Sequence, residues 1–361
     1  MIRRIFVFLL LSALLSVPAL ATELESALGL QKLYDAVPPE AEAALGELRP
    51  ESPDAEGAIQ RLLDYAQSRI YDAGAEILRP LAAIAAICLL SGIGGSLSPG
   101  RTGPDAVALG SCLAIAVIGV EDVHSVMALG SRTLTALLDF SRVLLPVLMT
   151  AAATSGAVGA AGASYAAAAL WSDILLSAAE RFLLPLICAF TAAATASGVL
   201  GDSRLDGAVR FLRWCARSGM KLLVLGFTAY LSLTGILASA ADAAAVKAAK
   251  TVLSAALPVV GKLMADASEA LVAGAGLLRS AVGVYGMLVC LAIVLLPVLR
   301  LGLRCLLFRG AAAVCSGIAG QRQAKLISDL ADAYGMLLGL VGSGAAMEFL
   351  AIISLIRTVT T

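Results

Sequence analysis

The side chains most able to do chemistry are a few charged residues inside long apolar stretches. Glu348 stands near the middle of one such stretch, residues 333–356. A carboxylate at bilayer depth costs about 2.5–3.5 kcal/mol on insertion scales, so it should face a partner or a water-filled cavity. We interpret Glu348 either as a pore-lining or proton-linked group, or as a structural group that is protonated or paired with an Arg or Lys of another helix.

A second group of charges lies in residues 242–280, a segment too polar for a simple membrane span and too apolar for a solvated loop. Asp242 and Lys250 are spaced to share one face of a helix. Pro258, with Gly261 just beyond it, predicts a break between two helices. The charged positions of this Pro-broken amphipathic segment are Asp242, Lys247, Lys250, Lys262, Asp266 and Glu269.

Two arrangements would suit the segment 242–280. Broken helices occur at membrane depth only where protein or water satisfies the freed backbone groups, and a re-entrant or pore-lining hairpin meets that condition. A pair of interfacial helices that connects two spans is the alternative. Under the first interpretation the charged residues of the segment are candidates for lining a passage.

The rest of the sequence argues against an enzyme. The chain has one histidine, His124, which disfavours a His-based metal site or a catalytic triad. The seven cysteines show no paired spacing. Walker A, H-E-x-x-H and G-x-S-x-G motifs do not occur. We therefore expect no catalytic residue, no cofactor and no metal site, and another subunit must supply any energy that transport needs.

The elements that must position these residues are membrane helices. Apolar residues make up 60% of the 361 residues and charged residues 14%, and the mean hydropathy is +0.92. A soluble domain carries about 25% charged residues, so we predict an all-α, polytopic integral membrane helical bundle. A span needs about 20 apolar residues. The candidate segments are 78–97, 106–120, 143–163, 182–200, 219–238, 281–299 and 333–356.

The number of crossings is six or seven. The basic segments 201–218 and 300–332 read as loops, and the positive-inside rule places both in the cytoplasm. Such loops set orientation and contact anionic lipid, and do not by themselves indicate nucleic-acid binding. If the chain begins outside, six crossings satisfy the rule, provided that the short segment 106–120 does not span.

The chain should begin outside because residues 1–21 resemble a cleaved signal peptide, with Arg3 and Arg4 before an apolar core and an A-x-A site that ends at Ala21. An uncleaved anchor is the alternative. Residues 22–77 then form a small, acidic, extracytoplasmic helical leader, and residues 78–361 form the multi-pass transmembrane domain.

Small residues indicate close helix packing. Gly335 and Gly339 form a small-xxx-small step within the last apolar segment. Such steps allow helix backbones to approach closely in lipid, either within one chain or between copies.

A string of short motifs around the Pro-broken segment resembles the stage III sporulation protein AE family. The leader, the L-L-P-V-L run at 144–148 and the apolar C-terminal helix extend the resemblance over nearly the whole chain. The motifs are T-G at 234–235, D-A at 242–243, K-A-A-K at 247–250, P-V-V-G at 258–261, D-A at 266–267, Glu269, A-G-A-G at 273–276 and A-V-G-V at 281–284.

The resemblance implies a role that the residues alone do not reveal. Family members are membrane components of the channel complex, similar to a secretion apparatus, that links mother cell and forespore during endospore formation. It implies a multi-pass protein of the mother-cell membrane that faces the forespore. The implied partners are the other membrane proteins of the stage III sporulation A operon, a separate ATPase subunit, a forespore-side protein, the lipid bilayer and further copies of the chain.

Three functions fit these expectations. The chain could help to form the conduit, or it could be a non-conducting assembly scaffold of the same complex. An autonomous small-solute transporter is the third, although such folds often contain paired broken helices in internal repeats, and only one broken segment is evident here.

Overall fold

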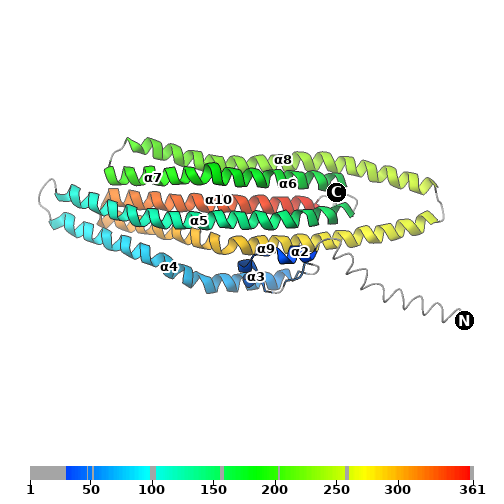
Figure 1. Ribbon diagram of the computed structural model, residues 1–361, viewed down its shortest axis with the longest axis horizontal. Helices are drawn as coiled ribbons and strands as arrows, with labels where there is room; N and C mark the ends of the chain where they lie inside the picture. The colour runs from blue at the N-terminus through cyan, green and yellow to red at the C-terminus, as the bar shows by residue number, and fades with distance from the viewer. Residues whose placement is uncertain are drawn as a thin grey trace.

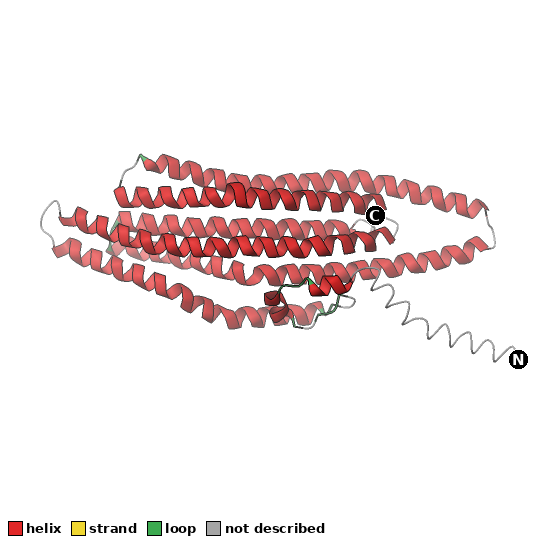
Figure 2. Ribbon diagram, viewed as in Figure 1, coloured by secondary structure: helices red, strands yellow, loops and turns green. Residues whose placement is uncertain are grey.

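The computed structural model describes residues 30–46, 48–50, 53–97, 103–154, 158–201, 204–256 and 260–357. All secondary structure in these ranges is helical (Figures 1 and 2). The predicted signal peptide, residues 1–21, lies outside the described residues. The predicted all-α class is therefore confirmed for the part of the chain that the structure describes.

Two short helices precede the bundle. Helix α2 (Leu30–Asp35) and helix α3 (Pro39–Leu45) pack beside the long helices, and α3 contacts α9 (Val260–Ile318) (Figure 1). Gly46 ends α3 with a φ of 67°, a conformation that glycine adopts without steric cost. Asp54 then caps the next helix, since its Oδ1 accepts a hydrogen bond from the Gly57 N–H at 3.0 Å.

Long helices run side by side along the molecule (Figure 1). In chain order they are α4 (Ala55–Leu97), α5 (Gly103–Thr154), α6 (Val158–Ala178), α7 (Leu184–Leu200), α8 (Leu205–Ala256), α9 (Val260–Ile318) and α10 (Gln321–Arg357). A π-helical turn, η1 (Ala179–Leu183), joins α6 to α7 without a loop. Gly201 ends α7 in the left-handed conformation, and its N–H donates to the Ser197 carbonyl at 2.9 Å.

The interior of the bundle is filled by side chains. Helix α10 contacts each of the helices from α5 to α9. Its Tyr334 is fully buried and lies edge-to-face with Phe308 of α9, with ring centroids 4.9 Å apart. Phe140, Phe190 and Tyr285 are also almost completely inaccessible. Large aromatic side chains on several helices therefore contribute to the packing of the described bundle.

Among the described residues, five helical segments are long and apolar enough to cross a membrane, judged by length and composition. They are Ala55–Gly94, Ala106–Ala151, Ala168–Leu200, Ser280–Ile318 and Gln321–Ile356. Large apolar side chains such as Leu90 and Val117 are also exposed on the outside of the bundle. An apolar interior combined with apolar outer positions fits a protein that is solvated by lipid. The predicted segment 219–238 lies within α8, whose side chains are described only as far as residue 232.

The helix boundaries correct two predictions. Segments 201–218 and 300–332 are mostly helical, because α8 begins at Leu205 and only residues 319–320 separate α9 from α10. Segment 106–120 is not a separate short element, since α5 continues unbroken to Thr154. The predicted boundary at residue 77 between the leader and the transmembrane domain falls inside helix α4, and it stays a prediction. The charges that suggested loops instead pair with charges on neighbouring helices, as described next.

Candidate functional site

Glu348 lies on the inner face of α10 and is 2% exposed. Its partners come from two other helices: Ser141 of α5 donates a hydrogen bond to Oε2, and Ser172 of α6 donates one to Oε1 at 3.2 Å. Both serines are themselves buried. Glu348 forms no ion pair with any Lys or Arg that the structure describes. The carboxyl group is thus satisfied by hydroxyl groups alone.

A second buried polar group surrounds Arg304 of α9, which is 3% exposed. Arg304 Nη2 lies 3.0 Å from Glu76 Oε1 of α4, and Nε lies 3.3 Å from Asp122 Oδ2 of α5. Tyr334 of α10 donates a hydrogen bond to the same Asp122 oxygen. The Arg304 guanidinium thus joins α9 to α4 and α5, and Tyr334 adds α10 to this group through Asp122.

Three arginines converge on Asp332 of α10. Arg213 and Arg217 come from α8, at 3.1 and 3.2 Å, and Arg309 comes from α9, at 3.0 Å. Arg213 also pairs with Asp329 at 2.6 Å. The side chains of Asp329 and Asp332 are 8% and 12% exposed, so the carboxylates lie inside the bundle while two of the arginines reach its surface.

We call these two sets together the charge belt. Its members on α10 fall within six consecutive positions, which span about 8 Å along a helix axis. The belt therefore marks one level of the bundle and connects α4, α5, α8, α9 and α10. Its residues are Glu76, Asp122, Arg213, Arg217, Arg304, Arg309, Asp329, Asp332 and Tyr334.

The sequence prediction missed the charge belt and the two serines beside Glu348. The bases of the belt were assigned to loops because they are locally concentrated, whereas their acidic partners are about a hundred or more positions away for α8 and for Asp122. Acids that recur inside apolar sequence, such as Asp122 and Asp332, were the signal that could have indicated buried pairs.

The charged residues of the Pro-broken segment lie where the structure describes the backbone but no side chains. Helix α8 ends at Ala256 and α9 begins at Val260, and Pro258 between them lies outside the described residues. Gly261 lies in the first turn of α9. The ends of α8 and α9 that flank this point extend beyond the other helices (Figure 1). These two helix ends carry the six charged positions of the predicted segment, which are Asp242, Lys247, Lys250, Lys262, Asp266 and Glu269.

The two glycines predicted to pack helices lie on α10. A Cβ placed on Gly335 would be 3.6 Å from Cys305 Sγ of α9, which is ordinary contact distance. A Cβ on Gly339 would be 3.3 Å from Met220 Sδ of α8, closer than most such contacts. Gly339 remains exposed on its outer side.

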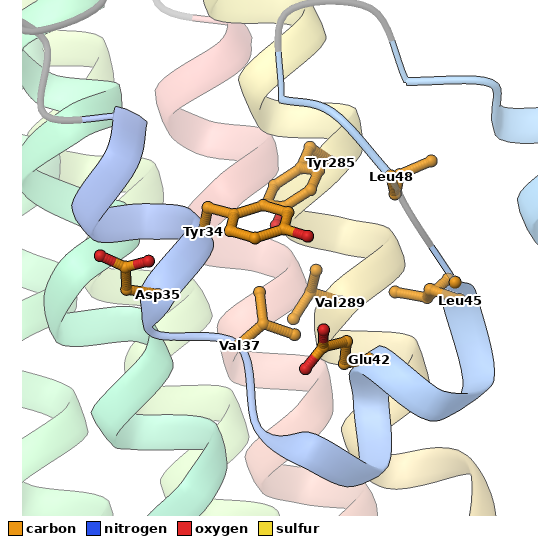
Figure 3. Close-up of a pocket in the computed structure, with 9 residues that line it drawn as sticks. Tyr34, Asp35, Val37, Glu42, Leu45, Leu48, Tyr285 and Val289 are labelled. Carbon is orange, nitrogen blue, oxygen red and sulfur yellow. The ribbon is translucent and has the colours of Figure 1, made fainter.

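A small cavity of about 180 Å³ lies where α2 and α3 meet α9 (Figure 3). Tyr34 and Val37 from the leader and Tyr285 and Val289 from α9 line it (Figure 3). Glu42 and Asp35 bring acidic groups to its edge. Apolar and aromatic side chains of the leader helices and of α9 meet around this cavity.

Metal chemistry has no visible basis in the described residues. No three His, Cys, Asp or Glu side chains are grouped there so that they could hold an ion. Buried cysteines such as Cys88 and Cys290 lie inside apolar helices, where cysteine behaves as a small apolar residue.

Comparison with known proteins identifies the family. The sequence model of stage III sporulation protein AE matches residues 49–359. The chain belongs to the stage III sporulation protein AE family. A relative of that name from Bacillus subtilis (strain 168) is 20% identical over 213 residues, which cover 58% of this chain and 52% of the relative. The chain thus spans about half the length of the curated relative that it matches, and no solved structure matches it.

Proposed function

We propose that this chain is a membrane component of the channel complex between mother cell and forespore that endospore formation requires, and that it helps to form the conduit in the mother-cell membrane. The observation that carries the proposal is the family match over residues 49–359, on a bundle with five segments suited to crossing a membrane. Membership of the family supports a role in sporulation, and the conduit is our inference.

The filled interior limits how such a conduit could form. Large buried side chains such as Tyr334 of α10 and Phe308 of α9, whose rings are in contact, fill the space between the described helices. A passage would therefore lie between copies of the chain, or between this chain and partner subunits. The extended ends of α8 and α9, which carry Asp242 and Lys250, are the elements that we assign to its lining.

The proposed role is not enzymatic. The chain would depend on a separate ATPase subunit for energy and on the other membrane proteins of the stage III sporulation A operon and a forespore-side protein for assembly. This part of the proposal rests on the family resemblance and on the lack of nucleotide-binding motifs in the sequence.

A non-conducting scaffold is the second candidate, and the filled interior favours it. The same small-residue and apolar faces would then bind partner helices without enclosing water. The two functions differ in one measurable property, which is the access of water to the segment 242–280.

Cysteine accessibility separates the two functions. Single cysteines are placed along 242–280 in a background without the native cysteines, and cells are treated with a membrane-impermeant maleimide. A cysteine restored at the buried position 290 is the unreactive control, and a cysteine at the helix-capping position 54 is the reactive one. Reaction at mid-membrane positions supports a conduit, and uniform protection of the segment supports a scaffold.

Charge reversal tests the lining more directly. Asp242→Lys and Lys250→Glu should abolish sporulation in a spore-forming host that lacks its own family member, while the protein still accumulates in the membrane. Arg69→Glu, an exposed position on α4 with one weak ion pair, is the matched control. Normal sporulation of the Asp242 and Lys250 variants would contradict the lining.

A further inference from the structure

A long apolar groove runs along the outside of the bundle between α8 and α10. Its volume is about 650 Å³, compared with about 180 Å³ for the cavity beside α2 and α3 and about 230 Å³ for a hollow between α4 and α9. Residues from one face of helix α8 form one wall of the groove, and residues of α10 form its floor. The lining residues are Arg217, Met220, Lys221, Val224, Leu225, Thr228, Gly335, Met336, Gly339 and Ser343.

The groove exists because α10 presents small residues there. Gly335, Gly339 and Ser343 recur every four positions and so lie on one face of the helix. The Ser343 hydroxyl donates to the Leu340 carbonyl of its own helix, so it needs no partner across the groove. The resulting hollow offers shape and apolar surface but few polar groups along most of its length.

Positive charge is concentrated at one end of the groove. Of the α8 residues that line the groove, Arg217 and Lys221 are basic and lie at its N-terminal end. The other α8 residues of the lining are uncharged. Arg217 shares Asp332 with two other arginines, and its side chain is 50% exposed. Lys221 is exposed and forms no ion pair among the residues described. This end therefore carries cationic charge that the protein itself does not neutralise.

The cationic end lies at the charge belt, and the apolar part leads away from it. Arg217 is a belt residue, whereas Gly339 and Ser343 follow on the stretch of α10 between the belt and Glu348, which contains no charged residue. From Arg217 to Thr228 the groove follows α8 for about 16 Å. One leaflet of a bilayer has a hydrocarbon thickness of about 15 Å, half of the whole core.

We propose that this groove binds one anionic phospholipid, with an acyl chain along Gly335, Gly339 and Ser343 and the phosphate against Lys221 and Arg217. The length matches one leaflet, the charge matches a phosphate, and Met220 and Met336 supply adaptable apolar walls. A partner helix would also bury the small residues, but it would leave Lys221 without a counter-charge unless it brought an acid.

The test uses the full-length chain purified in mild detergent after reconstitution with phosphatidylglycerol, and counts retained lipids by native mass spectrometry. Lys221→Gln and Gly339→Leu should each lose one tightly retained phosphatidylglycerol relative to the unchanged protein. Replacement of phosphatidylglycerol by phosphatidylcholine should cause the same loss without any substitution.

Two matched variants control for position. Arg132→Gln removes an exposed base from α5, and Gly342→Leu adds the same side chain to α10 at a glycine with open space around it. Both should retain the lipid. Equal retention by Lys221→Gln, Gly339→Leu and the controls would overturn the proposal, as would loss of self-association rather than of lipid in Gly339→Leu. Should Gly339→Leu fail to fold, Lys221→Gln and the exchange of lipid still decide the outcome.

Discussion

Asp332 and Glu348 lie on the same helix, and both carboxyl groups are buried, yet their surroundings differ. Asp332 meets three arginines from two helices, whereas Glu348 meets two serine hydroxyls and no described base. The sixteen positions between them separate the two groups by about 24 Å along the axis. Helix α10 thus carries an acid that pairs with arginines at one level and an acid that is hydrogen-bonded only to serine hydroxyls at another.

The difference indicates different roles. A buried ion pair fixes the register of the helices that it connects, although replacing it by apolar residues is often neutral for stability. The charge belt connects five helices and therefore suits a fixed structural level. A buried acid without a cation costs free energy unless hydrogen bonds satisfy it, as the two serines do for Glu348. The charge belt is thus the candidate for a role in architecture, and the variants of Glu348 described below test whether this acid has a role beyond structure.

The largest effect should follow from removing the most buried base of the belt. Arg304→Met leaves Asp122 without its cation, and removal of one partner of a buried pair costs about 3–5 kcal/mol. The free energy of unfolding of the full-length protein in micelles, followed by circular dichroism during titration with SDS, measures this loss. Arg142→Met is the control, because Arg142 is 54% exposed and its pairs should contribute about 0–1 kcal/mol. Equal losses of unfolding free energy in the two variants would show that the ion pairs of the charge belt contribute no more to stability than an exposed surface pair.

A second prediction concerns the side of the belt opposite to Glu348. A Cβ on Gly92 of α4 would lie 2.5 Å from the Ile318 carbonyl oxygen of α9, so Gly92→Ala must displace a backbone. We expect a loss of about 1–3 kcal/mol in the same unfolding measurement. Gly74→Ala on the same helix has nothing within 4 Å and should be neutral or slightly stabilising. A neutral Gly92→Ala would show that α4 and α9 are less closely packed there.

The Glu348 cluster should tolerate a neutral isostere. The amide oxygen of Glu348→Gln can accept from one of the two serines, Ser141 or Ser172, and its NH2 group can donate to the hydroxyl oxygen of the other, so the stability should change by about 1 kcal/mol or less. Glu348→Leu removes the acceptors and should cost more. If Glu348 serves passage, Glu348→Gln should lower spore counts strongly despite normal folding. Normal spore counts for this variant would assign Glu348 a structural role only.

The smallest effect is a pH dependence at the surface, beside the belt. Lys325 of α10 and the Ser197 hydroxyl, at 2.7 Å, hold the pKa of Asp206 below its ordinary value of 3.8. Because the folded-state pKa is lowered, the stabilisation is present above the unfolded pKa and is lost as pH falls through the lower, folded value. The melting temperature of Asp206→Asn should therefore fall less than that of the unchanged protein when pH drops from about 5 to 3, around the usual aspartate pKa. Parallel curves would show that this contact contributes nothing.

The sequence predicted the class of the fold but not its dimensions. Long apolar segments and few charges predict membrane helices, and the part of the chain that the structure describes has five such candidates. A carboxylate at position 348 had to face a partner, and it faces two. Local composition could not show that Arg213 pairs with Asp329, a contact between residues 116 positions apart. Without that pairing, a basic stretch resembles a loop.

The predicted helix boundaries were wrong because pairing between distant residues cannot be seen in the local sequence. The end of a membrane helix is inferred from the point where charges begin, but here α5 and α9 continue through charged positions because neighbouring helices neutralise them. The sequence did not predict the groove between α8 and α10: Gly335 and Gly339 indicated close helix packing, and the structure shows in addition a hollow that these glycines line.

The unbroken length of α5 has a mechanical consequence. Its 52 residues form a rod of about 78 Å, whereas the hydrocarbon core is about 30 Å thick. Even at a tilt of about 40°, a bilayer covers only half of such a rod. The half outside the lipid and the half inside it belong to one continuous helix. A force that a partner exerts on the outer half can therefore rotate the half inside the membrane.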